Sequence, residues 1–121
     1  MTKSLKIAPP NSLFFLSDVG GGQVPDFESG KLVLATDSVV SIRCLANVDG
    51  KTKISLGARA EVDSAAIVVF SGSLKTPSRR LVVSTVEEDA VLREDVSGTV
   101  TKVVISANRE TEPDEIVVAW E

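Results

Sequence analysis

The chain has 121 residues, of which 43% are apolar and 25% charged, proportions that are typical of one folded domain, and we assign residues 1–121 to it. Its formal net charge of −4 disfavours nucleic acid and anionic membranes as main partners, because both are bound through clusters of Lys and Arg. The absence of histidine removes Ser/His/Asp and Cys/His catalysis and most zinc and iron sites.

Apolar and polar residues alternate along much of the chain, and this period of two predicts β-strands with one buried face. Turn residues separate the alternating stretches, and no window shows a sustained helical period. In chain order, strands are expected near residues 12–16, 31–35, 38–48, 51–62, 65–70, 79–86, 90–96, 99–107 and 116–120. The pattern predicts an all-β fold, an antiparallel β-sandwich of about eight or nine short strands, with a closed β-barrel as the alternative.

The sequence Asp49-Gly50 lies between the two clearest alternating stretches and is a strong hairpin signal. A three-residue loop, 48–50, keeps the apolar residues of both strands on one face, whereas a two-residue loop would mix the faces. We therefore expect a hairpin that pairs Cys44 with Ile54, with Gly50 in a left-handed conformation.

Three further expectations concern the core. Residues 65–70 are apolar on both faces, which predicts a central or doubly covered strand. Cys44, the only cysteine, lies on the inward face of its strand and should behave as a small, inert hydrophobe. Trp120 has the parity of Ile116 and should close the core over the last strand.

Signals for export and membrane insertion are missing from the sequence. The apolar run Leu13–Leu16 is shorter than the roughly 7–15 residues of a signal-peptide core. A single cysteine permits no intramolecular disulfide. We therefore expect a cytoplasmic protein.

Three consecutive glycines, Gly20–Gly22, raise the question of a phosphate-binding loop. Such a loop needs a helix after the last glycine, usually begun by Lys and then Ser or Thr. Here Gln23, Val24 and Pro25 follow, and no helical pattern comes after them. We interpret the stretch as an irregular connection between strands that is able to contact a partner.

Acidic residues gather in the expected loops. Loops at the end of a sandwich can chelate calcium, but no spacing of the EF-hand type occurs, so solvated loop tips are the preferred interpretation. The basic run Lys75–Arg80 is interpreted as protection of a sheet edge against aggregation. The sequence therefore assigns no catalytic, metal-binding or cofactor-binding residue.

We expect a small non-catalytic domain that acts by protein–protein interaction or as a subunit of a homo-oligomer. One alternative is an acidic inhibitor or immunity-type protein that masks a basic enzyme such as a nuclease. Another is a carboxylate- or calcium-dependent domain that processes or binds carbohydrate. The candidate partner-binding residues are Asp18, Gln23, Asp26 and Glu28 in the glycine-rich stretch and Arg109, Glu110, Glu112 and Asp114 in the loop before the last strand.

Overall fold

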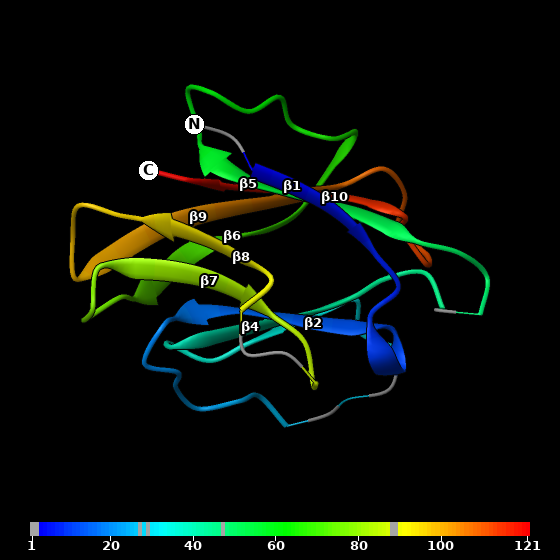
Figure 1. Cartoon of the computed structure of the whole chain (residues 1–121), viewed down its shortest axis with the longest axis horizontal. Helices are drawn as coiled ribbons and strands as arrows, with labels where there is room; N and C mark the ends of the chain where they lie inside the picture. Colours follow the sequence, from blue (N-terminus) through cyan, green and yellow to red (C-terminus); the bar gives the residue numbers. More distant parts are fainter. Residues whose placement is uncertain (1–2, 27, 29, 47, 88–89) are drawn as a thin grey trace.

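In the computed structural model of the chain, two β-sheets pack face to face (Figure 1). The structure describes residues 3–26, 28, 30–46, 48–87 and 90–121. These residues form a 3₁₀ turn at Pro10–Ser12 and ten strands, which are β1 (Lys3–Ile7), β2 (Leu13–Asp18), β3 (Val33–Ala35), β4 (Val39–Arg43), β5 (Thr52–Ala58), β6 (Ile67–Lys75), β7 (Arg80–Ser84), β8 (Leu92–Asp95), β9 (Val100–Ala107) and β10 (Glu115–Trp120). The all-β sandwich is confirmed, with one or two strands more than expected and with two separate sheets in place of a closed barrel.

Each sheet has five strands. The first sheet has the order β1-β5-β10-β9-β6, and the second has the order β3-β4-β2-β7-β8. Neighbouring strands are antiparallel except β5 and β10, which run parallel. The last strand, β10, therefore occupies the centre of the first sheet.

Alternate residues of both sheets fill the space between them. In β2 the side chains of Phe14 and Leu16 are fully buried, and in β5 those of Ile54 and Leu56 are. Burying one such side chain contributes about 1.5–3 kcal/mol. Cys44 is only 3% exposed, and Trp120 packs against the core, so the predicted positions of both side chains are confirmed. The low reactivity of Cys44 stays a prediction.

The predicted hairpin at residues 48–50 is wrong, because β4 and β5 belong to different sheets. The apolar faces themselves are as expected, since Val40, Ile42, Ile54 and Leu56 are all fully buried. Two strands that face each other across a core show the same alternation as two strands paired side by side. Gly50 does have a positive φ, of 141°, as the turn chemistry predicted.

The prediction of a central strand at residues 65–70 is also wrong, because β6 is an edge strand paired only with β9 among the described strands. A bulge between Val68 and Phe70 shifts its register. Val69 and Phe70 consequently both pack against the core, although they are adjacent in sequence. The bulge therefore explains why residues 65–70 are mostly apolar although only one face of β6 packs against the core.

Loops gather at two opposite ends of the sandwich. At one end, the Leu45 amide donates to the Pro113 carbonyl, and the Lys53 amide donates to the Asp114 carbonyl. At the other end, the Val19 amide donates to the Arg80 carbonyl. We name these the Glu112 end and the Asp18 end.

Candidate partner-binding surface

The eight candidate residues from the sequence fall in different parts of the molecule. Asp18 and Gln23 lie at the Asp18 end, and the loop formed by residues 108–114 lies at the Glu112 end. Asp26 and Glu28 lie on the segment that leads from the first end towards the second. The eight residues therefore do not form one patch.

Asp18 is 1% exposed and is held by the backbone around it. One carboxylate oxygen accepts a hydrogen bond from the Gly20 amide at 2.9 Å, and the other accepts one from the Ser78 amide at 2.9 Å. Burial raises the pKa of this carboxyl, but the hydrogen bonds from Gly20 and Ser78 outweigh burial and leave the pKa below its usual value. These contacts fix the end of β2 and the first glycine of the run.

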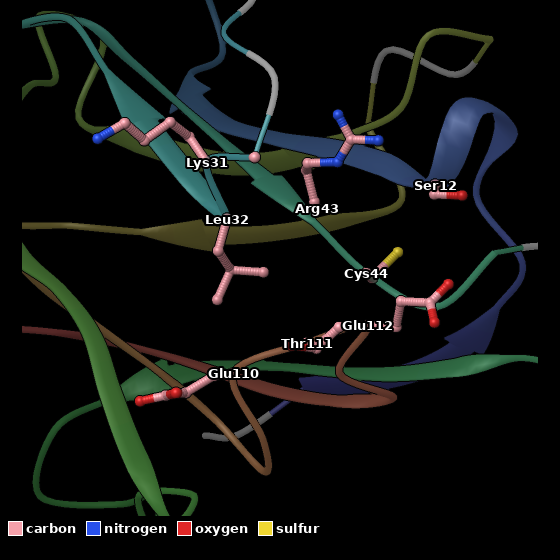
Figure 2. A pocket seen from close by; sticks show the side chains of 9 residues that line it. Ser12, Lys31, Leu32, Arg43, Cys44, Glu110, Thr111 and Glu112 are labelled. Atoms are coloured by element: carbon pink, nitrogen blue, oxygen red, sulfur yellow. The ribbon is translucent and has the colours of Figure 1, made fainter.

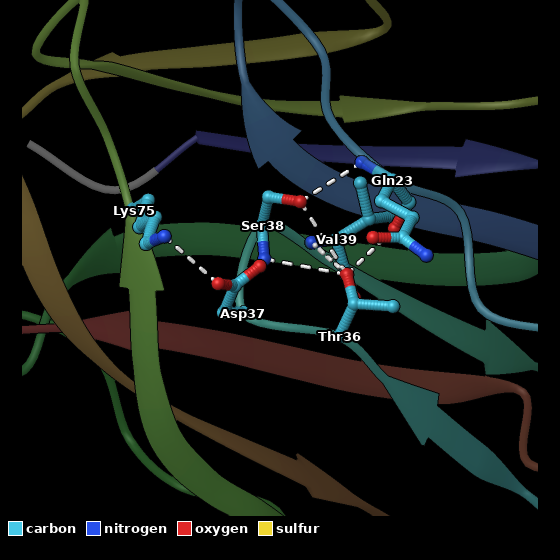
Figure 3. Close-up of polar contacts among 6 residues, drawn as sticks. All are labelled: Gln23, Thr36, Asp37, Ser38, Val39 and Lys75. Carbon is cyan, nitrogen blue, oxygen red and sulfur yellow. Dashed lines mark hydrogen bonds and ion pairs between the residues drawn. The ribbon is translucent and has the colours of Figure 1, made fainter.

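The rest of the glycine run is anchored against the turn between β3 and β4 (Figure 3). The Gln23 amide donates to the Ser38 hydroxyl at 2.8 Å, and the Thr36 hydroxyl donates to the Gln23 carbonyl at 2.6 Å. A Cβ atom on Gly22 would lie 2.5 Å from the Cβ of Ser38, closer than real contacts allow. Gly22 is therefore required for the close approach of this segment to the turn.

The first regular element after the glycine run is the strand β3, whereas a phosphate-binding loop is followed by a helix.

Beyond Gln23, the segment crosses the outer face of the second sheet. Val24 and Pro25 line a pocket of about 170 Å³ together with Phe15 and Leu34, and Glu28 and Lys31 line it as well. Asp26 is exposed in the hollow beside this pocket. The segment thereby carries Glu28 and Lys31 towards the Glu112 end.

Within the loop formed by residues 108–114, two of the four candidates bond to other residues of the loop. The Arg109 Nε donates to the carbonyls of Thr111, at 3.2 Å, and Glu112, at 3.0 Å. The carboxylate of Asp114 accepts a hydrogen bond from the Asn108 side-chain amide at 2.6 Å. The side chains of Glu110 and Glu112 are exposed. Arg109 and Asp114 thus shape the loop, and Glu110 and Glu112 carry exposed negative charge on it, next to the partly exposed cation of Arg109.

A cavity of about 230 Å³ joins the two stretches that the sequence had singled out (Figure 2). Figure 2 shows Cys44 and Glu112 on one side of this cavity and Lys31 and Glu110 on the other. Arg43, from the end of β4, also lines it. The sequence did not indicate Lys31 or Arg43 as candidates. Alternation places Arg43 on the polar face of its strand, but it does not predict which loops lie against that face.

Charged side chains differ between the two ends. At the Asp18 end, cations and carboxylates are paired: Lys75 Nζ lies 2.9 Å from Asp37 Oδ2, and Arg80 Nε lies 3.0 Å from Asp95 Oδ1. At the Glu112 end, the exposed side chains have both signs: Asp49, Glu110 and Glu112 are negative, and Lys51, Lys53 and Arg109 are positive. Glu110 and Glu112 therefore supply exposed negative charge at an end that also carries exposed cations.

Within the described ranges, no group of three or more His, Cys, Asp or Glu side chains is arranged to hold a metal ion. In the part of the chain that the structure describes, no helix has the length and apolar character needed to cross a membrane.

Two solved structures have a similar fold over nearly the whole chain. The first is ComJ from Bacillus subtilis, described as an inhibitor of the DNA degrading activity of NucA, with 14% identity and a TM-score of 0.70 over 98% of this chain and 93% of that one. The second is the protein described as crocagin biosynthetic gene J, with 13% identity and a TM-score of 0.53 over 99% of this chain and 97% of that one. No protein-family model and no curated protein sequence matches the chain. At these identities the likeness concerns the fold alone.

Proposed function

We propose that this protein is a non-catalytic inhibitor that binds a basic enzyme, such as a nuclease, and covers its substrate-binding surface. The observation that carries the proposal is the similarity in fold to ComJ, which is described as an inhibitor of a DNA-degrading enzyme. Since 98% of this chain and 93% of that one are covered, the similarity extends across both sheets and is not limited to a shared hairpin.

Charge supports the same function. An enzyme that degrades nucleic acid binds phosphates through Lys and Arg, so its substrate cleft is positive. This chain has a net charge of −4, and exposed carboxylates such as Glu110 and Glu112 lie at one end of the sandwich. A net negative charge accelerates association with a positive surface and disfavours partners of the same sign.

The loop formed by residues 108–114 is suited to rigid docking. Arg109 holds two of its backbone carbonyls and Asp114 holds the Asn108 side chain, so that Glu110 and Glu112 project from a preformed turn. A surface that is already ordered loses less conformational entropy on binding. We therefore place the contact at the Glu112 end, with Glu110 and Glu112 at its centre.

The proposal is tested by adding the purified protein to a lysate of its native host and measuring degradation of linear DNA. We expect inhibition that rises with the amount of protein and falls at high salt, because charge steers the association. The immobilised protein should then capture a basic enzyme, and the captured enzyme, once purified, should be inhibited at a one-to-one ratio. A capture without inhibition at molar excess would contradict the proposal, and so would unchanged DNA degradation in the lysate.

A further inference from the structure

The two sheets expose four edge strands, and these edges differ in length and charge. In the second sheet, β3 has three residues and β8 has four, of which Arg93, Glu94 and Asp95 are charged. In the first sheet, β1 has five residues and includes Lys3 and Lys6. Short strands and charged side chains are the usual protection of an edge against pairing with another chain.

The remaining edge, β6, lacks that protection. It has nine residues, and it is uncharged from Ile67 to Leu74. Ser71 and Ser73 are exposed, and their side chains are small. A long uncharged edge with small exposed side chains is an open template for another strand.

The hydrogen bonds around Lys75 indicate which backbone groups face this open edge. The Lys75 amide donates to the Asp37 carbonyl at 2.9 Å, away from β9, whereas the Thr76 amide donates to Thr99 on the β9 side at 2.8 Å. Because the direction alternates along a strand, the amides and carbonyls of Ser71 and Ser73 point to the same side as the Lys75 amide. Within the described part of the chain, β9 is the only strand paired with β6, so these groups lack a strand partner.

The turn between β3 and β4 blocks the open edge at one position only. Asp37 accepts from the Lys75 amide, and its carboxylate pairs with the Lys75 ammonium group (Figure 3). An added strand therefore meets Asp37 at Lys75 and finds free backbone groups at Ser73 and Ser71. This limits the pairing to the part of β6 centred on Gly72.

We infer that β6 pairs with β6 of a second copy of this chain, antiparallel, across a two-fold axis at Gly72. Ser71 of each copy lies opposite Ser73 of the other, and each of these two pairs exchanges both backbone hydrogen bonds. The two first sheets then form one continuous sheet. A two-fold contact of this type is closed, so association stops at the dimer.

Charge favours a second copy over a strand from a basic partner. The chain carries a net charge of −4, so two copies repel unless they meet where carboxylates are absent. β6 offers such a place, and an uncharged edge gives a basic strand no electrostatic gain. The inference does not depend on the proposed inhibition, which concerns the Glu112 end.

Analytical ultracentrifugation of the full chain between about 10 µM and about 1 mM tests the inference. We expect a concentration-dependent dimer in the wild type. Ser71→Pro removes an edge-facing amide from both copies, which should weaken dimerisation by about 30-fold. Ser71→Lys should weaken it by about fivefold or more, because it places like charges across the axis. Ser4→Lys adds the same charge to the edge strand β1 and should leave the dimer unchanged.

Hydrogen exchange of the wild type tests the same contact without a substitution, so a folding defect in a variant cannot produce the result. In the wild type, the amides of Ser71 and Ser73 should exchange more slowly at high protein concentration, while amides on β1 keep their rates. A wild type that remains monomeric at about 1 mM would overturn the inference, and so would a dimer that Ser71→Lys leaves intact. A monomer whose binding to a captured enzyme is weakened by Ser71→Pro would show that the edge receives a strand of that enzyme instead.

Discussion

The carboxylate of Asp18 accepts a hydrogen bond from the backbone amide of Ser78, 60 positions later in the chain, at 2.9 Å. Its second oxygen accepts from the Gly20 amide, also at 2.9 Å. One buried carboxylate thus connects the end of β2, the first glycine of the run and the turn between β6 and β7. Its position explains why an acidic residue precedes Gly20–Gly22 without requiring a ligand.

Replacement of Asp18 should destabilise the fold. In Asp18→Asn the side chain has only one acceptor oxygen, so one of the two backbone amides loses its partner. We expect the free energy of unfolding to fall by about 1–3 kcal/mol, measured by urea denaturation. Asp26→Asn makes the same chemical change at an exposed position and should stay within about 0.5 kcal/mol of the wild type.

The same carboxylate should make stability depend on pH. Because the pKa of Asp18 is lowered in the folded protein, its contribution is present above the unfolded pKa and is lost as the pH falls through the folded pKa. The difference in unfolding free energy between wild type and Asp18→Asn should therefore shrink in acid. A difference that stays constant from neutral pH to strongly acidic pH would contradict this role.

Reversal of charge at the Glu112 end tests the proposed contact. Glu110→Lys and Glu112→Lys should each slow association with the captured enzyme by about tenfold at low salt, because exposed charge acts mainly on the association rate. Their thermal stability should stay close to that of the wild type, since both side chains are exposed. Stopped-flow or surface-plasmon-resonance kinetics give the rates.

Asp95→Lys is the matched control for these two variants. It makes the same change in net charge at the Asp18 end, where Asp95 pairs with Arg80 on the exposed surface. Equal slowing by all three substitutions would assign the effect to total charge and would contradict a contact at the Glu112 end.

Cys44 should react slowly in the native protein. Its side chain is only 3% exposed, and burial raises the pKa of the thiol, so little thiolate is present near neutral pH. Labelling with a chromogenic disulfide reagent should be slow in buffer and fast in urea. Native labelling as fast as that of the unfolded chain would mean that the adjoining cavity opens to the thiol.

Gly22→Ala should detach the glycine-rich stretch from the turn between β3 and β4. The new Cβ would lie 2.5 Å from Ser38 atoms, so Ser38 must move and release the Gln23 amide. We expect a loss of about 1–3 kcal/mol and faster hydrogen exchange at Gln23. Adding Ser38→Gly to this variant removes the clashing atoms and should recover part of the loss.

Gly21→Ala separates backbone strain from steric overlap. Gly21 has a φ of 82°, and a Cβ there would meet nothing within 4 Å. We expect a cost of about 1–2 kcal/mol from the left-handed conformation, with hydrogen exchange at Gln23 unchanged. Faster exchange at Gln23 in both variants would contradict the steric role of Gly22.

Alternation predicted the faces of the strands but not their partners. The burial of Val40 and Ile54 follows directly from a period of two, because side chains of a strand alternate between its faces. The placement of β4 and β5 in different sheets depends on contacts far apart in sequence. The bulge in β6 had no local signal, since a run of apolar residues looks the same in a central strand. β1 was not predicted, because two lysines break its short apolar pattern.

The candidate surface was predictable only as separate loops. Turn composition indicated that the stretch before β3 and the loop before β10 are irregular, and the structure places Lys31 of one and Glu110 of the other in the lining of the same cavity. Sequence could not predict this meeting, because it follows from the order of strands in the two sheets. It also could not distinguish Asp18, which holds the backbone, from Glu112, which is exposed.

The position of β10 between β5 and β9 has a consequence for how the protein is made. Among the described strands, β5 and β9 are joined within the first sheet by β10, which pairs with both and is the last of the ten in the sequence. We therefore expect the first sheet to stay in two parts, β1-β5 and β9-β6, until Glu115–Trp120 have been synthesised. Completion of this sheet should come late in folding, and its strand pairings over long sequence separations should make it slow.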